Sequence, residues 1–423
     1  MAVQNIEDVG YQGTKHITAC LFVNFFMISS IGLLAGALIS NISKRITAYA
    51  VIMAVVFSAS YLLDRVAVMV MILTDYSINF YDILDVLNVM PQGLRFATNN
   101  SLGFPIMGYR ICLILFWVFL LLIFLSLSRS RKRKYVKAGI CLIVCVACLF
   151  GYAMPASKID MSMNSSGSTM ADQHYYHRNG YLKKEIKGGF HVERYIMELD
   201  TRRLLKAKVT MEVSESLEQF RFTLSHSYTV SKVYDQDNKD LEFEQDKDIL
   251  LVHGNGKRIE RITVIYAGAS EAYYSNAQGT NLPGSFPYYP IPGYRRITED
   301  GQRMNCLFLE NDTEFDVRLK GYGRMYTNIE EIGNRHYAGK SNGLSLFSGI
   351  YADVEKDGIR IVYPYLIGWG EKELERMASA LNDAGYESNQ VFIAPNMNKI
   401  ISAVSKEQII TTGYFESIKD LLL

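Results

Sequence analysis

Aromatic and proline residues gather in one stretch of the chain, where they offer a surface that could hold a peptide. The stretch reads LPGSFPYYPIPGYRR, from Leu282 to Arg296. Prolines stiffen an exposed loop, aromatic rings supply rigid amphipathic area, and an arginine beside them could bind an anion. The candidate substrate-binding residues are Tyr273, Tyr274, Phe286, Tyr288, Tyr289 and Arg295. The alternative is a loop packed over the edge of a sheet, as proline-rich connections often are.

The histidines and glycines of the sequence do not form a catalytic pattern. None of the seven histidines stands in H-E-x-x-H, which would place two zinc ligands and a glutamate base on one helical face. Asp172, His174 and His177 lie in a polar stretch, and we expect them to be solvated, because a structural zinc site requires four converging ligands. There is no G-x-x-x-x-G-K-[ST] loop for a nucleotide. We therefore predict no catalytic residue and no metal site in this chain.

Composition divides the 423 residues into two parts, and the second part contains the candidate peptide-binding residues. The long uncharged runs lie in the first 155 residues, whereas the rest mixes charged, aromatic and β-branched residues. A net charge of only +1 leaves no general basic field, so we expect no nucleic-acid partner. The second half contains a single cysteine, Cys306, so it has no internal disulfide. The other cysteines are Cys20, Cys112, Cys141, Cys145 and Cys148, all in apolar runs.

Four uncharged runs predict a four-helix transmembrane region over residues 1–155. A helix of about 20 residues crosses a hydrocarbon core of about 30 Å. The predicted spans are 17–40, 46–74, 109–128 and 138–154. The segment 76–108 is too polar to span and too apolar for a free loop, so we expect it to lie in the outer interface.

Basic residues in two connections set the expected orientation. They are Lys44, Arg45, Arg129, Arg131, Lys132, Arg133, Lys134 and Lys137. Short basic loops stay on the cytoplasmic side of a membrane. We therefore predict a multi-pass plasma-membrane protein with lipid as a partner, and with its N-terminus, residues 76–108 and everything after Pro155 outside the cell.

Period-two patterns predict strands in the second half. Buried positions would be Leu205, Ala207, Val209, Met211 and Val213, with polar residues between them. The pattern recurs around Phe220, Ile262, Phe315 and Ile359, separated by turn-rich pieces. After a flexible linker over 156–180, we expect an extracytoplasmic all-β, antiparallel sandwich over 181–368. Helical spacing from Leu374 to Leu381 and the apolar run VFIAP then predict the start of a mixed α/β lobe over 369–423.

The topology of the first half resembles part of a known class of transporter. Paired spans joined by an outward helical segment look like the last third of the membrane subunit of ATP-binding-cassette exporters of the drug and polysaccharide type. Such subunits begin inside the cell and have six spans per half. The resemblance implies further membrane segments on another chain and ATP used through a separate ATPase subunit.

Phrases of the second half carry another resemblance. In chain order they are VERYIMELDTRRLLKAKVTMEV, FRFTLSHSYTVSKVYDQDNKDLEFEQD, ITVIYAG, LPGSFPYYPIPGYRR, FDVRLKGYGRMYTN, GLSLFSGIYAD and IRIVYPYL. This succession is similar to the N-terminal β-domain of zinc aminopeptidases of the aminopeptidase N type, including versions fused to bacterial exporter subunits. The resemblance implies a saddle-like β-domain beside a catalytic lobe with H-E-x-x-H and G-x-M-E-N motifs. Both motifs are absent here, which implies that this lobe is cut off after its opening elements, and that zinc belongs to the protein only if another lobe completes it.

Several functions remain open from the sequence. The first is the membrane-embedded part of an exporter-type permease whose non-catalytic β-domain binds or guides a peptide-like substrate. The second is the membrane and substrate-domain half of a split or truncated zinc aminopeptidase. A four-span anchor for an adhesive or sensory β-domain and a truncated remnant without function are the others.

Overall fold

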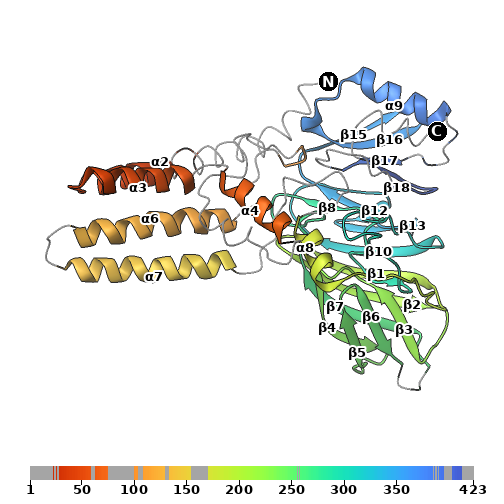
Figure 1. Cartoon of the computed structure of the whole chain (residues 1–423). Coiled ribbons are helices and arrows are strands. Elements are labelled where there is room, and N and C mark those ends of the chain that lie inside the picture. The colour runs from red at the N-terminus through yellow and green to blue at the C-terminus, as the bar shows by residue number, and fades with distance from the viewer. Residues whose placement is uncertain are drawn as a thin grey trace. The chain divides into compact units, whose positions relative to one another are not determined.

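The computed structural model divides the chain into two compact units (Figure 1). Unit 1 comprises Met1–Thr98 and Gly103–Ala156, and unit 2 comprises Asn99–Leu102 and Ser157–Leu423. The residues described are 22, 25, 28–58, 62–74, 100–102, 108–128, 133–153, 170–383 without 255 and 257, 385, 388, 390–394 and 403–411. Cys20, Arg129, Arg131, Lys132, and most of the predicted interfacial segment and linker lie outside them.

The helices of unit 1 correct the prediction of a four-helix transmembrane region. They are α2 (Ile28–Ile39), α3 (Arg45–Ser58), α4 (Leu62–Leu73), α6 (Gly108–Ser128) and α7 (Lys134–Ala153). Among the described residues only α6 and α7, with 21 and 20 residues, are long and apolar enough to cross a membrane. The others have 12 or 14 residues and so reach only about 18–21 Å of the roughly 30 Å required.

Uncharged polar residues mark the C-terminal end of α2. Ser40 Oγ and Asn41 Nδ2 both donate to the carbonyl oxygen of Ala37, at 2.8 and 2.6 Å, where α2 ends. Such side chains compete with the helical hydrogen-bond ladder. The helix therefore ends within one residue of the predicted boundary at Ser40.

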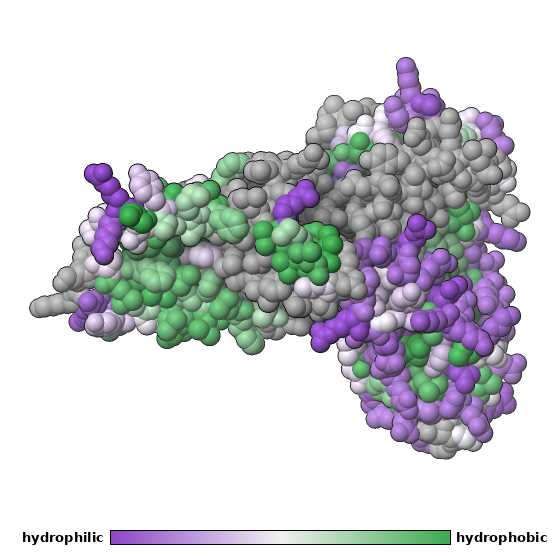
Figure 2. Space-filling view, in the orientation of Figure 1, coloured by the Kyte–Doolittle hydropathy of each residue, from purple (hydrophilic) through white to green (hydrophobic). Residues whose placement is uncertain are grey.

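Helices α6 and α7 keep an apolar outer surface. Figure 2 shows hydrophobic side chains over this part of unit 1 and hydrophilic ones over the strands of unit 2. On α7, Ile143 and Phe150 remain 71% and 69% exposed. Within unit 1, α2 packs on α6 through a small core of Ile31, Ala35, Ile114 and Leu121.

A seven-stranded sheet forms the centre of unit 2, in the order β12-β13-β10-β1-β2-β7-β4. Its strands are β1 (Val192–Asp200), β2 (Leu205–Val213), β4 (Tyr228–Asp235), β7 (Arg261–Gly268), β10 (Thr313–Lys320), β12 (Glu330–Gly333) and β13 (His336–Ser341). The strand predicted over Leu205–Val213 is therefore confirmed as β2. The expectation of a purely antiparallel sheet is wrong, because β1 pairs with β10 in parallel.

Two smaller sheets share the core with the seven-stranded sheet. One contains β5 (Phe243–Asp246), β6 (Ile249–His253), β3 (Gln219–Thr223) and β9 (Ile291–Pro292), and the other β11 (Met325–Thr327), β14 (Leu346–Ser348) and β8 (Thr280–Leu282). Alternate residues of β1, β2, β3 and β6 point into one hydrophobic cluster. Residues between these inward positions face outward, which leaves a polar face on the seven-stranded sheet.

The C-terminal lobe is a five-stranded mixed sheet covered by a helix (Figure 1). Its strands are β15 (Tyr351–Lys356), β16 (Ile359–Pro364), β17 (Gln390–Ile393), β19 (Ile409–Thr411) and β18 (Ala403–Val404), and its helix is α9 (Glu371–Asp383). Leu374, Met377, Ala378 and Leu381 of α9 are buried, at the helical spacing expected. The lobe begins earlier than expected, because β15 and β16, which fall within 181–368, pair with β17 instead of the sandwich.

Helix α8 (Met170–Asn179) occupies the end of the segment expected to be a flexible tether. Tyr176 is 1% exposed and belongs to the core of the β-domain. Asp172, expected to be solvated, is 5% exposed. Its Oδ1 lies 3.6 Å from His226 Nε2, and the other ring nitrogen of His226 lies 3.0 Å from Asp248 Oδ1. The stack of Tyr175 on the His226 ring, at 3.6 Å between centroids, completes this docking of α8.

Residues 100–102 also belong to unit 2. The side chain of Ser101 is fully buried, with its Oγ 3.0 Å from the hydroxyl of Tyr274. Ile350 N donates to the Ser101 carbonyl at 2.6 Å. Gly349 has φ +135°, and a Cβ there would lie 2.5 Å from the same carbonyl oxygen, so the close approach requires glycine.

Candidate functional site

The predicted aromatic site is part of the core. Tyr288 and Tyr289 are fully buried, and Tyr274 and Phe286 are 1% and 4% exposed. Tyr273 is half-buried, with its ring 4.1 Å from that of Phe286. These rings do not form an exposed surface that could bind a ligand. The structure agrees with the alternative, in which the loop packs against the sheet.

Backbone carbonyls make this burial possible by accepting the tyrosine hydroxyls. Tyr288 Oη donates to the Leu344 carbonyl at 2.8 Å. Tyr266 Oη donates to the Tyr288 carbonyl at 2.7 Å, and Tyr195 Oη to that of Pro290 at 2.9 Å. Burial raises the pKa of Tyr288 and Tyr195 well above the usual value, so both remain neutral donors.

Arg295 is held by the β-domain itself. Its backbone N donates to Thr223 Oγ1 at 2.8 Å, and its Nη1 donates to the Phe308 carbonyl. The guanidinium therefore supports the fold of this loop. Its predicted role toward an anionic substrate gains no support from these contacts.

The described residues contain no group of three or more His, Cys, Asp or Glu side chains that could hold a metal ion. The sequence contains no H-E-x-x-H motif in any of its 423 residues.

An open groove of about 860 Å³ crosses the outward face of the seven-stranded sheet. Its walls come from the same ends of β1, β2, β7, β4 and β10 and from the turn before β13. Strands lie about 4.8 Å apart, so a groove across these neighbours is about 20 Å long. The charged residues that line it are Glu198, Asp200, Lys206, Lys208, Arg318, Lys320, Arg335 and His336.

Strand register sets these charges in two rows across the sheet. In one row Glu198 of β1 stands between Arg318 of β10 and Lys208 of β2. In the next, Asp200 stands between Lys320 and Lys206. The parallel pairing of β1 with β10 brings these cations together from sequence positions more than 100 residues apart.

Both acidic side chains already have partners. Lys208 Nζ lies 3.1 Å from Glu198 Oε1. Arg202 donates to both carboxylate oxygens of Asp200, at 2.9 and 2.6 Å, and these hydrogen bonds hold the pKa of Asp200 below its usual value. The remaining charge of the groove is therefore positive.

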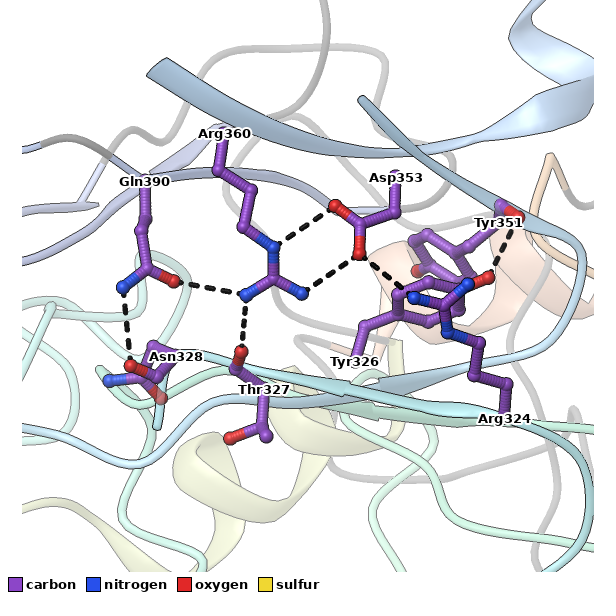
Figure 3. Close-up of polar contacts among 8 residues, drawn as sticks. All are labelled: Arg324, Tyr326, Thr327, Asn328, Tyr351, Asp353, Arg360 and Gln390. Carbon is purple, nitrogen blue, oxygen red and sulfur yellow. Dashed lines mark hydrogen bonds and ion pairs between the residues drawn. The ribbon is translucent and has the colours of Figure 1, made fainter. Parts of the chain in front are cut away.

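A polar joint connects the β-domain to the α/β lobe (Figure 3). Arg360 of β16 donates to both oxygens of Asp353 on β15, each at 3.0 Å. Its Nη1 also donates across the joint to the Thr327 carbonyl at 2.8 Å, and within the lobe to Gln390 Oε1 at 3.2 Å. Arg324 of the β-domain reaches the same carboxylate of Asp353 at 3.3 Å.

Amide side chains extend the joint on its buried side. Gln390 Nε2 donates to the Asn328 carbonyl at 3.2 Å (Figure 3). Ser345 Oγ donates to Gln408 Oε1 at 2.6 Å, and Gln408 Nε2 donates to the Gly343 carbonyl at 2.6 Å. Because Ser345 and Gln408 are fully buried, these bonds fix how the lobe sits on the β-domain.

Sequence reasoning missed both the groove and the joint. The outward positions of β1 and β2 could be read from their alternation, but their charges look like an ordinary solvated face. Only the pairing of β1 with β10 concentrates cations there, and that pairing leaves no local signal.

Two solved structures are similar to part of this chain. Yeast LTA4 hydrolase in complex with bestatin is 12% identical, with a TM-score of 0.38, over 53% of this chain and 40% of that one. An M1 zinc metallopeptidase from Deinococcus radiodurans is 17% identical, with a TM-score of 0.34, over 53% of this chain and 60% of that one. The sequence matches no protein-family model and no curated protein.

The chain spans 40% to 60% of the length of these structures. The predicted permease and its ATPase remain predictions from the sequence.

Proposed function

We propose that this chain supplies the substrate domain of a membrane-attached zinc aminopeptidase, with the zinc ligands contributed by residues outside these 423. The joint around Arg360 carries the proposal. A substrate domain must hold its ligand at a fixed place relative to the catalytic lobe, since a misplacement of about 1 Å can cost about 100-fold in rate. The hydrogen bonds of Arg360 and Gln408 provide such a fixed connection. The phrases of the second half that resemble aminopeptidase N favour the same class.

The test is a hydrolysis assay on membranes from cells that express the chain with and without its adjoining reading frames. We expect no hydrolysis of an aminoacyl-nitroanilide by the chain alone, and chelator-sensitive hydrolysis once a frame with H-E-x-x-H is co-expressed. Arg360→Met should then lower kcat more than it lowers the amount of assembled complex. If no adjoining frame restores zinc-dependent hydrolysis, and none co-purifies with the chain, the proposal fails.

Membrane attachment is the second part of the proposal and rests on α6 and α7. Their apolar outer surface and lengths of 21 and 20 residues suit two spans joined by a short basic loop. Arg133, Lys134 and Lys137 at the start of α7 would hold that loop inside the cell, so unit 2 would lie outside.

Cys306 offers a direct test of this orientation, because it is exposed and is the only cysteine after residue 148. A membrane-impermeant maleimide should label intact cells that carry the wild-type chain and leave the Cys306→Ser variant unlabelled. Labelling that requires permeabilised cells would place unit 2 inside and overturn the orientation. Release of the chain from membranes by alkaline carbonate would show that α6 and α7 do not span the membrane.

A further inference from the structure

The groove on the seven-stranded sheet carries more positive charge than its own carboxylates can neutralise. Of its lining residues Lys206, Lys208, Arg318, Lys320 and Arg335 are basic, whereas only Glu198 and Asp200 are acidic. The whole chain has a net charge of +1, so this concentration is local. A concave surface of one sign raises the local concentration of ligands of the opposite sign.

Most of these cations have no carboxylate partner in the described part of the chain. Lys208 pairs with Glu198, but Lys206, Arg318 and Lys320 make no ion pair among the described residues. Arg335 donates from Nη2 to the Gly323 carbonyl at 2.9 Å, while its buried Nη1 makes no hydrogen bond to any described group. That nitrogen is shielded from solvent, so Arg335 adds positive charge to the groove, whereas the exposed Lys206, Arg318 and Lys320 are the cations that can contact an added anion.

The other titratable groups around the groove do not offset this charge. Asp316 accepts from Arg194 at 2.9 Å and lies 2.7 Å from His336 Nε2, so both of its carboxylate oxygens already have partners. No further acidic residue among those described lines the groove.

An apolar strip lies beside the cations. Ile265 of β7 stands next to Lys208, and Ala267 stands next to Lys206, in the register of β2 with β7. Both side chains line the groove and are partly exposed. A phosphate polymer has no group to cover them, whereas a peptide can place acidic side chains over one region and an apolar side chain over the next.

We propose that this groove binds an extended acidic peptide segment, with its carboxylates on the rows of Lys206, Arg318 and Lys320 and an apolar side chain over Ile265. Residues i and i+2 of an extended peptide lie on one face about 6.8 Å apart, which matches the spacing of Arg318 and Lys320, two residues apart on the outward face of β10. Lys206 of β2 lies two strand spacings, about 9.6 Å, from Lys320. The inference rests on the proposed function only in taking peptides as the ligand class. It assigns a peptide-binding site on the outward face of the seven-stranded sheet.

The experiment measures fluorescence anisotropy of a labelled eight-residue peptide of alternating glutamate and leucine, with the full chain in detergent micelles. A matched peptide with glutamine in place of glutamate serves as the ligand control. We expect the acidic peptide to bind, the glutamine peptide to bind at least about tenfold more weakly, and salt to weaken the binding. Equal binding of both peptides overturns the proposal.

Variants locate the site. The double substitution Lys206→Gln with Lys320→Gln should weaken binding about tenfold. Lys340→Gln removes a cation from the exposed end of β13 outside the groove and should leave the affinity within about twofold. An equal loss in both variants would show general charge attraction rather than this site, and circular dichroism verifies that each variant is folded.

A third probe separates chemical classes. Inorganic polyphosphate that binds tightly while the acidic peptide does not would identify a polyanion site and overturn the peptide assignment. The outcome is also independent of the hydrolysis assay. If the chain binds the acidic peptide but no partner restores hydrolysis, the groove proposal stands and the aminopeptidase proposal fails. If hydrolysis is restored but the peptide does not bind, the aminopeptidase proposal stands and the groove proposal fails.

Discussion

Replacing Arg360 by methionine should loosen the α/β lobe from the β-domain. The substitution keeps most of the apolar stem but removes two hydrogen bonds to Asp353, at 3.0 Å each, and those to the Thr327 carbonyl and Gln390. It leaves the Asp353 side chain, only 15% exposed, with Arg324, which is itself 70% exposed. The main effect of the substitution is therefore that the Asp353 carboxylate loses Arg360, its principal partner.

The expected cost is about 2–3 kcal/mol of unfolding free energy. Removing one partner of a fully buried ion pair costs about 3–5 kcal/mol. The Arg360 side chain is 34% exposed, so water replaces part of the lost contacts and the cost falls below that range. For a domain of this size about 2–4 °C is lost per kcal/mol, which predicts a fall in Tm of roughly 4–12 °C.

Denaturant unfolding and hydrogen exchange measure this effect. Exchange should become faster in β15, β16 and β17 than in the seven-stranded sheet, since these strands belong to the loosened lobe. A double-mutant cycle with Asp353→Asn should give a coupling of about 1–2 kcal/mol. Arg258→Met, which removes an exposed ion pair with Glu260, is the control and should leave stability unchanged.

The reasoning fails if Arg360→Met unfolds at the same denaturant concentration as the wild type. It also fails if Arg360→Lys is fully stable, because lysine keeps the charge but cannot make the bidentate contact with Asp353.

Three further predictions concern the β-domain. His226→Gln removes the imidazole ring that lies between Asp172 and Asp248 and so weakens the attachment of α8. Trypsin should then cleave after Arg178 of α8 about tenfold faster, as measured by mass spectrometry. An unchanged cleavage rate would show that the ring does not hold α8 in place. Burial raises the pKa of Tyr175 to about 12, so its neutral form stabilises the fold fully below about pH 10, and that stability is lost as the pH rises to 12 by up to about 1.4 kcal/mol per pH unit. Phenolate absorbance and circular dichroism should therefore change together as the pH rises. Ionisation of Tyr175 well before the protein unfolds would contradict the burial of its ring. Gly268→Ala would place a Cβ 1.9 Å from the Ser227 carbonyl oxygen and should destabilise the domain by about 3 kcal/mol in thermal unfolding, whereas alanine at Gly333, where a Cβ meets nothing closer than 3.6 Å, should be tolerated.

The sequence predicted individual strands well because alternation is a local property. β2 and the inward positions of β10 follow directly from it, as does the apolar face of α9. The order of the strands could not be predicted in the same way. The pairing of β1 with β10 joins residues more than 100 positions apart in the sequence. Neither this pairing nor the groove that depends on it could therefore be predicted from local patterns.

One error has a physical origin in an uncharged polar group. Tyrosine suits both exposed loops and cores, and only the carbonyls that accept Tyr288 and Tyr195 show which case applies here. In the first half, the single span predicted over 46–74 appears as two shorter helices, α3 with 14 residues and α4 with 12.

The parallel neighbours β1 and β10 also determine when this domain can fold. Strand β1 ends at Asp200, but its second partner begins at Thr313, so one edge of β1 stays unpaired until the intervening segment has been synthesised. At about 5–20 residues per second this interval lasts roughly 6–23 s. An open edge with Tyr195 and Met197 on its apolar side is prone to pair with other chains during that time. Production of the protein should therefore depend on a chaperone that shields β1, and slower translation before Thr313 should increase aggregation.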